Sequence, residues 1–288
     1  MKKSQISFFL KKQIKLCCYK EMDSIKPGNV HKYSEGHNMT TKDFYKSADI
    51  ISKCLTKNNS HFCKKIFESV VEIKKKIKQN TNLGIILLLA PITSIILENG
   101  ILSKKKLHQR LIFLIKKQNI KNSMLFYKAI KIAKPGGLGQ SNNYDVNNIP
   151  NVGLYNAMKY AEKKDLIAKQ YVTGFKDIFK IGLPTYKKFK TKFKNDKWAL
   201  TGVYLNFLNK LTDSHIKRKK GKKDAEKVRK DAKNYFKLLK YKENDISMSI
   251  LTKKLLLFDK KLKSKGINPG TSADLTVTTF FIEKVTKK

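Results

Sequence analysis

The chain has 288 residues, and its 41% hydrophobic content is enough for a sizeable core, which excludes a largely disordered polypeptide. Its 63 basic and 22 acidic residues give a formal net charge of +41, which favours phosphorylated ligands. Arginine is preferred for contacts with nucleic-acid bases and phosphates, but it occurs only at Arg110, Arg218 and Arg229, so the charge gives little support to a nucleic-acid partner.

The N-terminal segment predicts a helix over residues 4–24. Its apolar residues recur at helical spacing, and the chain must leave the helix before Pro27 and Gly28. The first apolar stretch is cut short by Lys11 and Lys12 and is too brief for an export signal. The four cysteines form no C-x-x-C pair, so we expect reduced core thiols in a cytoplasmic protein.

A loop over residues 30–39 follows, and two more helices are predicted after it. Thr40 or Thr41 is expected to cap the first of these helices, with Asp43 in its opening turn. The second covers about residues 62–78, where apolar side chains again recur every three to four positions.

Residues 80–92 join a polar turn to the most apolar stretch of the chain. No charged residue occurs over residues 83–97, so this segment predicts a helix that is buried on all sides. At about 15 residues it is shorter than the roughly 20 needed to cross a bilayer, and no membrane association is expected. Gly84 permits close approach, so the N–H groups at this end can face an anion; the alternative is a turn that only caps the helix. The cap-type residues are Asn80, Thr81 and Asn82.

The rest of the chain also predicts helices. The segments with helical spacing are residues 102–118, 123–133, 154–181, 198–211, 216–237, 249–265 and 275–285. Pro184 is expected to end the long helix before it, and the lysine-rich residues 187–197 are expected to form an exposed loop or a frayed helix. No segment alternates with period two, and no repeat or linker divides the chain. The sequence therefore predicts an all-α protein, a single multi-helix bundle with one domain over residues 1–288.

Most acidic, histidine and glycine residues of interest lie in five turns between these helices. The turns are residues 26–39, 80–84, 134–139, 213–221 and 268–274. If the helix ends that carry them share one side of a bundle, the turns form one cleft. The Pro-Gly turns at 27–28 and 269–270 suit close approach of the backbone to phosphate oxygens, and Lys26 adds a positive charge.

The turn at 213–221 has two interpretations. Asp213 and His215 can form an acid–base pair or a metal contact, beside a basic run that suits a polyphosphate. Alternatively, Asp213 caps the next helix and the lysines form a solvated face. His37 is likewise either a catalytic group or a structural loop histidine. The P-loop, dinucleotide-binding, zinc-protease and serine-hydrolase motifs are absent from the sequence.

Several short motifs occur in a fixed order along most of the chain. They are Glu21-x-x-x-x-Lys26-Pro27-Gly28-Asn29-Val30, Gly36-His37-x-Met39, Asn80-Thr81-Asn82-Leu83-Gly84, Pro135-Gly136-Gly137-Leu138-Gly139, Asp165, Tyr171, Gly174-Phe175, Asp213-Ser214-His215-Ile216 with Arg218 and Gly221, and Asn268-Pro269-Gly270-Thr271-Ser272-Ala273-Asp274-Leu275. Together, over about residues 17–283, they resemble the ATP:dephospho-CoA triphosphoribosyltransferases, also called triphosphoribosyl-dephospho-CoA synthases.

The resemblance implies an all-helical enzyme that uses ATP with Mg²⁺. Such an enzyme joins the ribose C1 of ATP to the 2′-hydroxyl of 3′-dephospho-CoA and releases adenine. One departure concerns the central turn, which resembles N-T-H-K-G in the citrate and malonate branch, whereas Asn82 and Leu83 replace the histidine and lysine here. The chain looks more like the branch found in archaea and one-carbon-metabolising bacteria. The acceptor is therefore left open between dephospho-CoA and another cofactor intermediate, such as a pterin.

The resemblance and the chemistry together give a set of expected site residues. Cleavage of an N-glycosidic bond passes through an oxocarbenium-like state, which needs a carboxylate, an acid for the leaving base and a base for the attacking hydroxyl. The expected catalytic residues are Asp213, Asp274, Glu21, His37 and His215, and Asp213 and Asp274 are also expected to hold Mg²⁺. The residues expected to bind ATP and its phosphates are Lys26, Gly28, Asn80, Thr81, Asn82, Gly84, Arg218, Gly221, Asn268, Gly270 and Ser272.

The competing interpretation is a lysine-rich helical protein that binds nucleic acid without catalysis. Aromatic residues scattered among the lysines are compatible with it. The position of the lysines distinguishes the two, because a nucleic-acid footprint gathers them on one face. The sequence pattern spreads them over all helix faces, and it leaves a homo-oligomer open.

Overall fold

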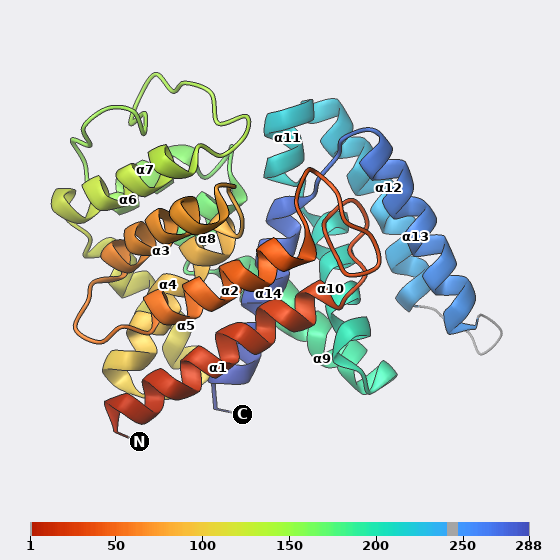
Figure 1. The fold of residues 1–288 in the computed structure, drawn as a ribbon, viewed down its shortest axis with the longest axis horizontal. Helices are drawn as coiled ribbons and strands as arrows, with labels where there is room; N and C mark the ends of the chain where they lie inside the picture. The colour runs from red at the N-terminus through yellow and green to blue at the C-terminus, as the bar shows by residue number, and fades with distance from the viewer. Residues whose placement is uncertain (1, 241–246, 288) are drawn as a thin grey trace.

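The computed structural model describes residues 2–240 and 247–287, and its named elements within these residues are all helical (Figure 1). The α-helices are α1 (Lys3–Met22), α2 (Thr41–Leu55), α3 (Phe62–Ile77), α4 (Leu83–Asn99), α5 (Lys104–Lys116), α6 (Ile120–Ala133), α7 (Leu154–Ala161), α8 (Leu166–Thr173), α9 (Leu183–Phe193), α10 (Asp196–Lys210), α11 (Ser214–Lys220), α12 (Lys222–Lys240), α13 (Met248–Ser264) and α14 (Gly270–Val285), with a π-helical turn η1 (Ile178–Gly182). The prediction of an all-α protein is confirmed.

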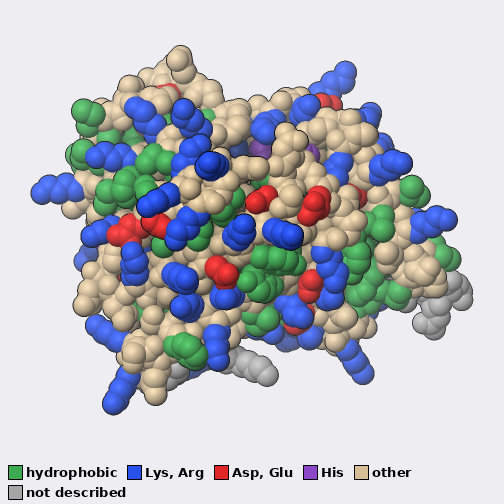
Figure 2. Space-filling view, in the orientation of Figure 1, with side chains coloured by type: hydrophobic (Ala, Val, Ile, Leu, Met, Phe, Trp, Pro, Cys, Tyr) green, Lys and Arg blue, Asp and Glu red, His purple; other side chains and the backbone are tan. Residues whose placement is uncertain are grey.

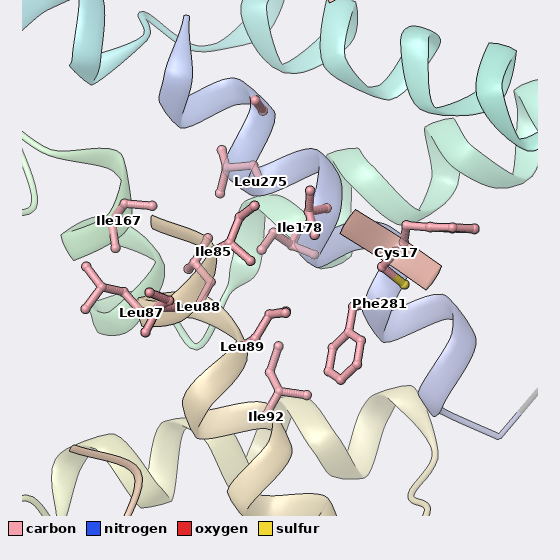
Figure 3. Close-up of a cluster of buried hydrophobic side chains, with 14 of the residues drawn as sticks. Cys17, Ile85, Leu87, Leu88, Leu89, Ile92, Ile167, Ile178, Leu275 and Phe281 are labelled. Carbon is pink, nitrogen blue, oxygen red and sulfur yellow. The ribbon is translucent and has the colours of Figure 1, made fainter. Parts of the chain in front are cut away.

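Helix α4 lies in the core, as its uncharged sequence predicts. Every residue from Ile85 to Leu97 is buried, and α1, α2, α3, α5 and α14 pack around it. Figure 3 shows side chains of α4 interleaved with those of α1, α8 and α14. Pro91 removes one backbone N–H inside the helix, so the carbonyl of Leu87 loses its helical donor. The hydroxyl of Tyr171 donates to that carbonyl at 2.5 Å, which satisfies it.

The segment after residue 153 differs from its prediction. The expected helix over 154–181 is divided into α7, α8 and η1, because Asp165 caps a new helix and Gly174 ends it at a left-handed φ of 62°. Pro184 lies in the first turn of α9 rather than ending a helix, a position where the missing N–H costs nothing. Residues 187–197, expected as an exposed loop or a frayed helix, are mostly part of α9, which Phe189 anchors in the core.

Helix α14 connects the two sides of the molecule. It packs against α4 on one side and α10 on the other. In Figure 1, α3, α6, α7 and α8 lie to the left of α14, and α11, α12 and α13 lie to the right. The N-terminal ends of α4 and α14 consequently come close together between these groups, which positions the site described below.

The charged surface and the cysteines agree with the sequence analysis. Lysine and arginine side chains are scattered over the face shown in Figure 2 and do not gather over one helix, so the nucleic-acid interpretation is not supported. The four cysteines are buried and free. Within the described residues, no helix is long and apolar enough to span a membrane.

Candidate active site

The five turns line one cavity of about 430 Å³. The residues that α1 and the turns contribute to its lining include Glu21, Asn29, Asn80, Asn82, Gly84, Pro135, Gly136, Leu138, His215, Arg218, Asn268, Gly270 and Asp274. Apolar residues of α6, α7 and α8 form an apolar part of the same lining. The prediction that the turns meet at one cleft is therefore confirmed, and the volume suits a nucleotide-sized group.

Asp274 presents a carboxyl group to this cavity without a protein partner. Among the described residues, no hydrogen bond or ion pair reaches its side chain, although its position in the first turns of α14 is fixed by the helix. A Cβ at Gly84 would overlap the carboxylate, so glycine is what lets α4 approach it. Burial raises the pKa of Asp274 well above its usual range, and the nearby carboxylates of Glu21 and Asp213 raise it further. Asp274 therefore keeps its proton to higher pH than an ordinary aspartic acid and can act as a proton donor.

The N-terminal end of α4 opens onto the cavity without a side-chain cap. Asn82 holds the N-cap position at a left-handed φ of 59°, and its side chain makes no capping hydrogen bond, contrary to the expected cap. The first helical residues, Leu83, Gly84 and Ile85, line the cavity. Thr81 is buried behind them and does not line the cavity, and its hydroxyl has no partner in the described chain. The exposed amides of a helix N-terminus form a site suited to an anion.

Lys26 lies behind the cavity wall and not in the cavity. It is fully buried, forms an ion pair with Glu21, and donates to Asn29 Oδ1 at 3.0 Å. Asn29 in turn donates to Asn268 Oδ1 at 2.8 Å. Burial lowers the pKa of Lys26 and raises the pKa of Glu21, while their attraction opposes both shifts. This arrangement argues against direct phosphate binding by Lys26 and indicates that it positions Glu21, Asn29 and Asn268.

Asp213 is a double helix cap. Its Oδ1 accepts from the backbone N–H groups of His215 and Ile216 at 2.9 and 3.1 Å, which caps α11. Its Oδ2 accepts from the N–H and the hydroxyl of Ser272, both at 2.8 Å, which caps α14. The side chain is fully buried, and neither Asp213 nor Ser272 lines the cavity. With four donors already bound, Asp213 is poorly placed for the predicted catalytic and magnesium-binding roles, and the same applies to Ser272 as a phosphate ligand.

His215 and Arg218 project from α11 into the cavity lining. Burial, assisted by the positive charges of Arg218 and Lys219, lowers the pKa of His215 to about 4, so the imidazole is neutral at pH 7. Its ring packs on Gly270, where a Cβ would overlap it. Arg218 forms an ion pair with Asp165, while its buried Nε has no partner in the described chain. The guanidinium therefore keeps one unsatisfied donor beside the cavity that Arg218 lines.

Three other predicted residues lie outside the cavity lining. His37 contacts the carbonyl oxygen of Gly28 through Nε2 at 2.8 Å, so it holds the loop over residues 26–39. The N–H of Gly28 donates to Asp259 Oδ1 at 2.8 Å and is not available to phosphate. Gly221 ends α11 at a φ of 89°, and its N–H bonds to Lys217. These positions argue against the predicted catalytic role of His37 and the phosphate-binding roles of the two glycines.

The cavity fits a magnesium ion only as a partner of the substrate. No group of three or more His, Cys, Asp or Glu side chains within 2–240 and 247–287 is placed to hold a metal. Magnesium usually keeps several waters and binds through one or two carboxylates together with substrate phosphates. Several side chains with oxygen ligands for such an ion line the cavity, among them Glu21, Asn80, Asn82, Asp165 and Asp274.

A second group of cavity residues had no role predicted from the sequence, although Asp165 is one of the residues that carry the family resemblance. Asp165 caps α8 and binds Arg218, and Tyr127, Tyr144 and Tyr160 line the apolar side. Asp165 has a readable signal, because a single aspartate before an apolar helical segment is typical of an N-cap. The tyrosines have none, since their positions depend on how α6, α7 and the connection between them fold back over α4.

Comparisons with known proteins bear on the same residues. A family model described as ATP:dephospho-CoA triphosphoribosyl transferase matches residues 8–288. The fold is similar to the crystal structure of a protein from Archaeoglobus fulgidus that is assigned as a triphosphoribosyl-dephospho-CoA synthase. The TM-score is 0.62, the sequences are 22% identical, and the match covers 83% of this chain and 97% of that chain. The comparison with curated proteins found no match.

Proposed function

This chain belongs to the ATP:dephospho-CoA triphosphoribosyl transferase family, and we propose that the cavity at the N-terminal ends of α4 and α14 is the place where it transfers a pentosyl group. In that reaction the 2′-oxygen of dephospho-CoA bonds to C1′ of the ATP ribose, and the bond from C1′ to N9 of adenine breaks. The attacking hydroxyl loses a proton and adenine gains one, so the reaction is balanced.

Asp274 is the proposed acid. A carboxyl group with a raised pKa and no protein partner can give its proton to a ring nitrogen of adenine as the C1′–N9 bond breaks. The carboxylate left behind then faces the positive charge that develops on C1′, and Glu21 adds a second negative charge on the same side. The proposal rests on one observation, the carboxyl group of Asp274 that lines the cavity without a partner among the described residues. The family reaction needs an acid of this kind next to the leaving adenine.

His215 is the proposed base for the acceptor hydroxyl. With a pKa of about 4 it is neutral at pH 7 and can accept a proton, although it is a weak base. A weak base is adequate when C1′ already carries positive charge, because the attacking hydroxyl becomes strongly acidic as its bond to carbon forms. Burial and then the charge of Arg218 lower the pKa of this imidazole, and Arg218 also lines the cavity, where it can bind an anionic substrate group.

The triphosphate is proposed to bind at the N-terminal end of α4. The uncapped amides of Leu83 and Gly84 and the guanidinium of Arg218 face this part of the cavity. Asn82 and Leu83 stand where the citrate and malonate branch has histidine and lysine, so the site relies on backbone dipoles and on Mg²⁺ that enters with ATP. A bound Mg²⁺ neutralises phosphate charge, and the amide oxygens of the two asparagines are its proposed protein ligands.

Three features of the chain support finer assignments. The Asn82-Leu83 pair supports placing the chain in the branch without histidine and lysine in the central turn, where the acceptor is dephospho-CoA or a related intermediate. Free buried cysteines support a cytoplasmic location. Buried residues from α1 to α14 form one connected cluster, which supports a single domain over 1–288.

The direct test is to incubate the purified protein with ATP, Mg²⁺ and dephospho-CoA and to measure free adenine by chromatography. We expect adenine to form in proportion to enzyme only when the acceptor is present. The same mixture with a pterin intermediate in place of dephospho-CoA distinguishes the two acceptor classes. Absence of adenine with every acceptor would contradict the proposal.

A further inference from the structure

Two tyrosines and a lysine stand where the cavity opens to solvent. Tyr144, on the connection between α6 and α7, and Tyr160, on α7, both line the cavity. Their side chains are 36% and 38% exposed, whereas Phe126, which lines the inner part, is fully buried. Lys164 also lines the cavity, and its Nζ lies 5.9 Å from the ring centroid of Tyr160. These three residues form the mouth cluster.

The rings of the mouth cluster form a corner. Their centroids are 5.5 Å apart and their planes meet at 89°. A planar base can stack on the face of one ring while its edge meets the other, which is a geometry that aromatic groups favour. The ammonium group of Lys164 at the side of this corner suits a phosphate joined to the base through a sugar.

Tyr144 is held in a strained backbone conformation. Its φ of 54° lies in the left-handed region, which aromatic residues seldom adopt. The hydroxyl of Tyr127 donates to the carbonyl oxygen of Tyr144 at 3.1 Å. Asp145 next to it accepts from the N–H groups of Ser141 and Asn147 at 2.6 and 2.8 Å, which fixes the turn. A strained residue that is held this firmly and yet presents an exposed ring to a cavity points to a binding role.

We propose that the mouth cluster binds the purine base and the adjacent pyrophosphate of the acceptor. This inference rests on the proposed function, in which two nucleotides must meet in the cavity. The adenine of ATP is the leaving group and must lie beside Asp274, at the inner polar end. A cavity of about 430 Å³ suits one nucleotide-sized group, so the second nucleotide extends to the mouth. The acceptor also carries a long chain beyond its pyrophosphate, which has to leave through the opening.

The test compares binding of the two nucleotides separately. Tyr160→Ala removes one ring from a helix, and Tyr144→Asn removes the other with a residue that tolerates a left-handed φ. The matched control is Tyr33→Ala, because Tyr33 is 49% exposed, lies 5.2 Å from the ammonium of Lys32, and does not line the cavity. Calorimetric titration with dephospho-CoA and with ATP, and the KM of each in the adenine assay, are the readouts.

We expect each cavity variant to bind dephospho-CoA at least about fivefold more weakly, which is the lower end of the loss when a stacking ring is truncated. The KM for the acceptor should rise by a similar factor, while ATP binding, kcat and the Tyr33→Ala control stay unchanged. Equal acceptor binding in wild type and variants, loss of ATP binding instead, or no dephospho-CoA binding by the wild type would each overturn the inference. A protein that binds dephospho-CoA through these tyrosines but releases no adenine would support the inference and contradict the proposed function.

Discussion

Replacing Asp274 by asparagine removes the proposed acid while keeping the shape of the side chain. The carboxyl group makes no hydrogen bond or ion pair with the described residues, so no protein contact is lost, and the amide fits the space against Gly84 that the carboxyl now fills. Burial and the negative charge of Glu21 already disfavour the carboxylate at this position. The free energy of unfolding at pH 7 should therefore fall by less than about 1 kcal/mol.

The loss of activity should be much larger. General acid catalysis contributes about 10²- to 10⁴-fold, so kcat should fall by that factor, equivalent to about 3–5 kcal/mol in the activation barrier. The assay is adenine release at saturating ATP and acceptor, accompanied by urea unfolding of the same preparations. Asp231→Asn is the matched control, because Asp231 pairs with Lys261 at 3.0 Å outside the cavity and its replacement should leave kcat unchanged.

The pH dependence of the same variant gives a second readout. In wild type, kcat should fall as pH rises through the raised pKa of Asp274, because the acid loses its proton. That decrease at high pH should be absent from the residual activity of Asp274→Asn. A variant that retains full activity, or one that loses activity because it unfolds, would refute the reasoning about this residue.

Further substitutions test the arrangement of Asp213, of the Lys26–Glu21 pair and of His215. Asp213→Asn should lower the free energy of unfolding by about 3 kcal/mol in urea, because it places an amide donor against the donors of Ser272; unchanged stability with lost activity would instead favour catalysis by Asp213. Lys26→Met should lower the free energy of unfolding by about 3–5 kcal/mol, because it leaves Glu21 buried without its partner. Adding Glu21→Gln should restore part of that loss. A raised KM for ATP at normal stability would contradict this. The free energy of unfolding of the wild type should rise between about pH 4 and 6.5, because the unfolded imidazole of His215 binds a proton there and the folded one, with a pKa of about 4, does not. In His215→Gln the thermal unfolding temperature should depend less on pH in that window. An unchanged dependence on pH would show that other groups cause it.

The position of the site was predictable because its signals are local. The uncharged run of α4 marks the core helix, and turns rich in proline, glycine and asparagine mark the helix ends around it. The sequence analysis predicts one cleft if these helix ends share one side of a bundle, and the lining of the cavity shows that they do.

The distinction between Asp213 and Asp274 was not predictable, because it depends on a contact between distant residues. Both aspartates lie near the start of a helix, and sequence alone makes either a cap or a catalytic group. The second cap of Asp213 uses Ser272, which is 59 positions away. Lys26 is a similar case, since a lysine beside a Pro-Gly turn suits phosphate, and only the packing of α1 against α14 buries it beside Glu21.

The apolar side of the cavity was not predicted, because apolar residues at regular helical spacing conceal the points where one helix ends and the next begins. Apolar residues continue at helical spacing through 154–181, which favours one helix, yet Asp165 and Gly174 divide it. The division turns α7 and α8 so that Met158 and Tyr160 face the cavity. A polar N-cap residue inside a periodic segment was the available signal.

The central claim is that the cavity joins two nucleotides and expels adenine, and mass spectrometry of one reaction mixture tests it most directly. The account predicts that the mass of dephospho-CoA increases by one triphosphoribosyl unit, in a one-to-one ratio with free adenine, and that both products decline together in Asp274→Asn. Adenine that forms without a matching adduct, or an adduct that still carries adenine from ATP, would contradict it.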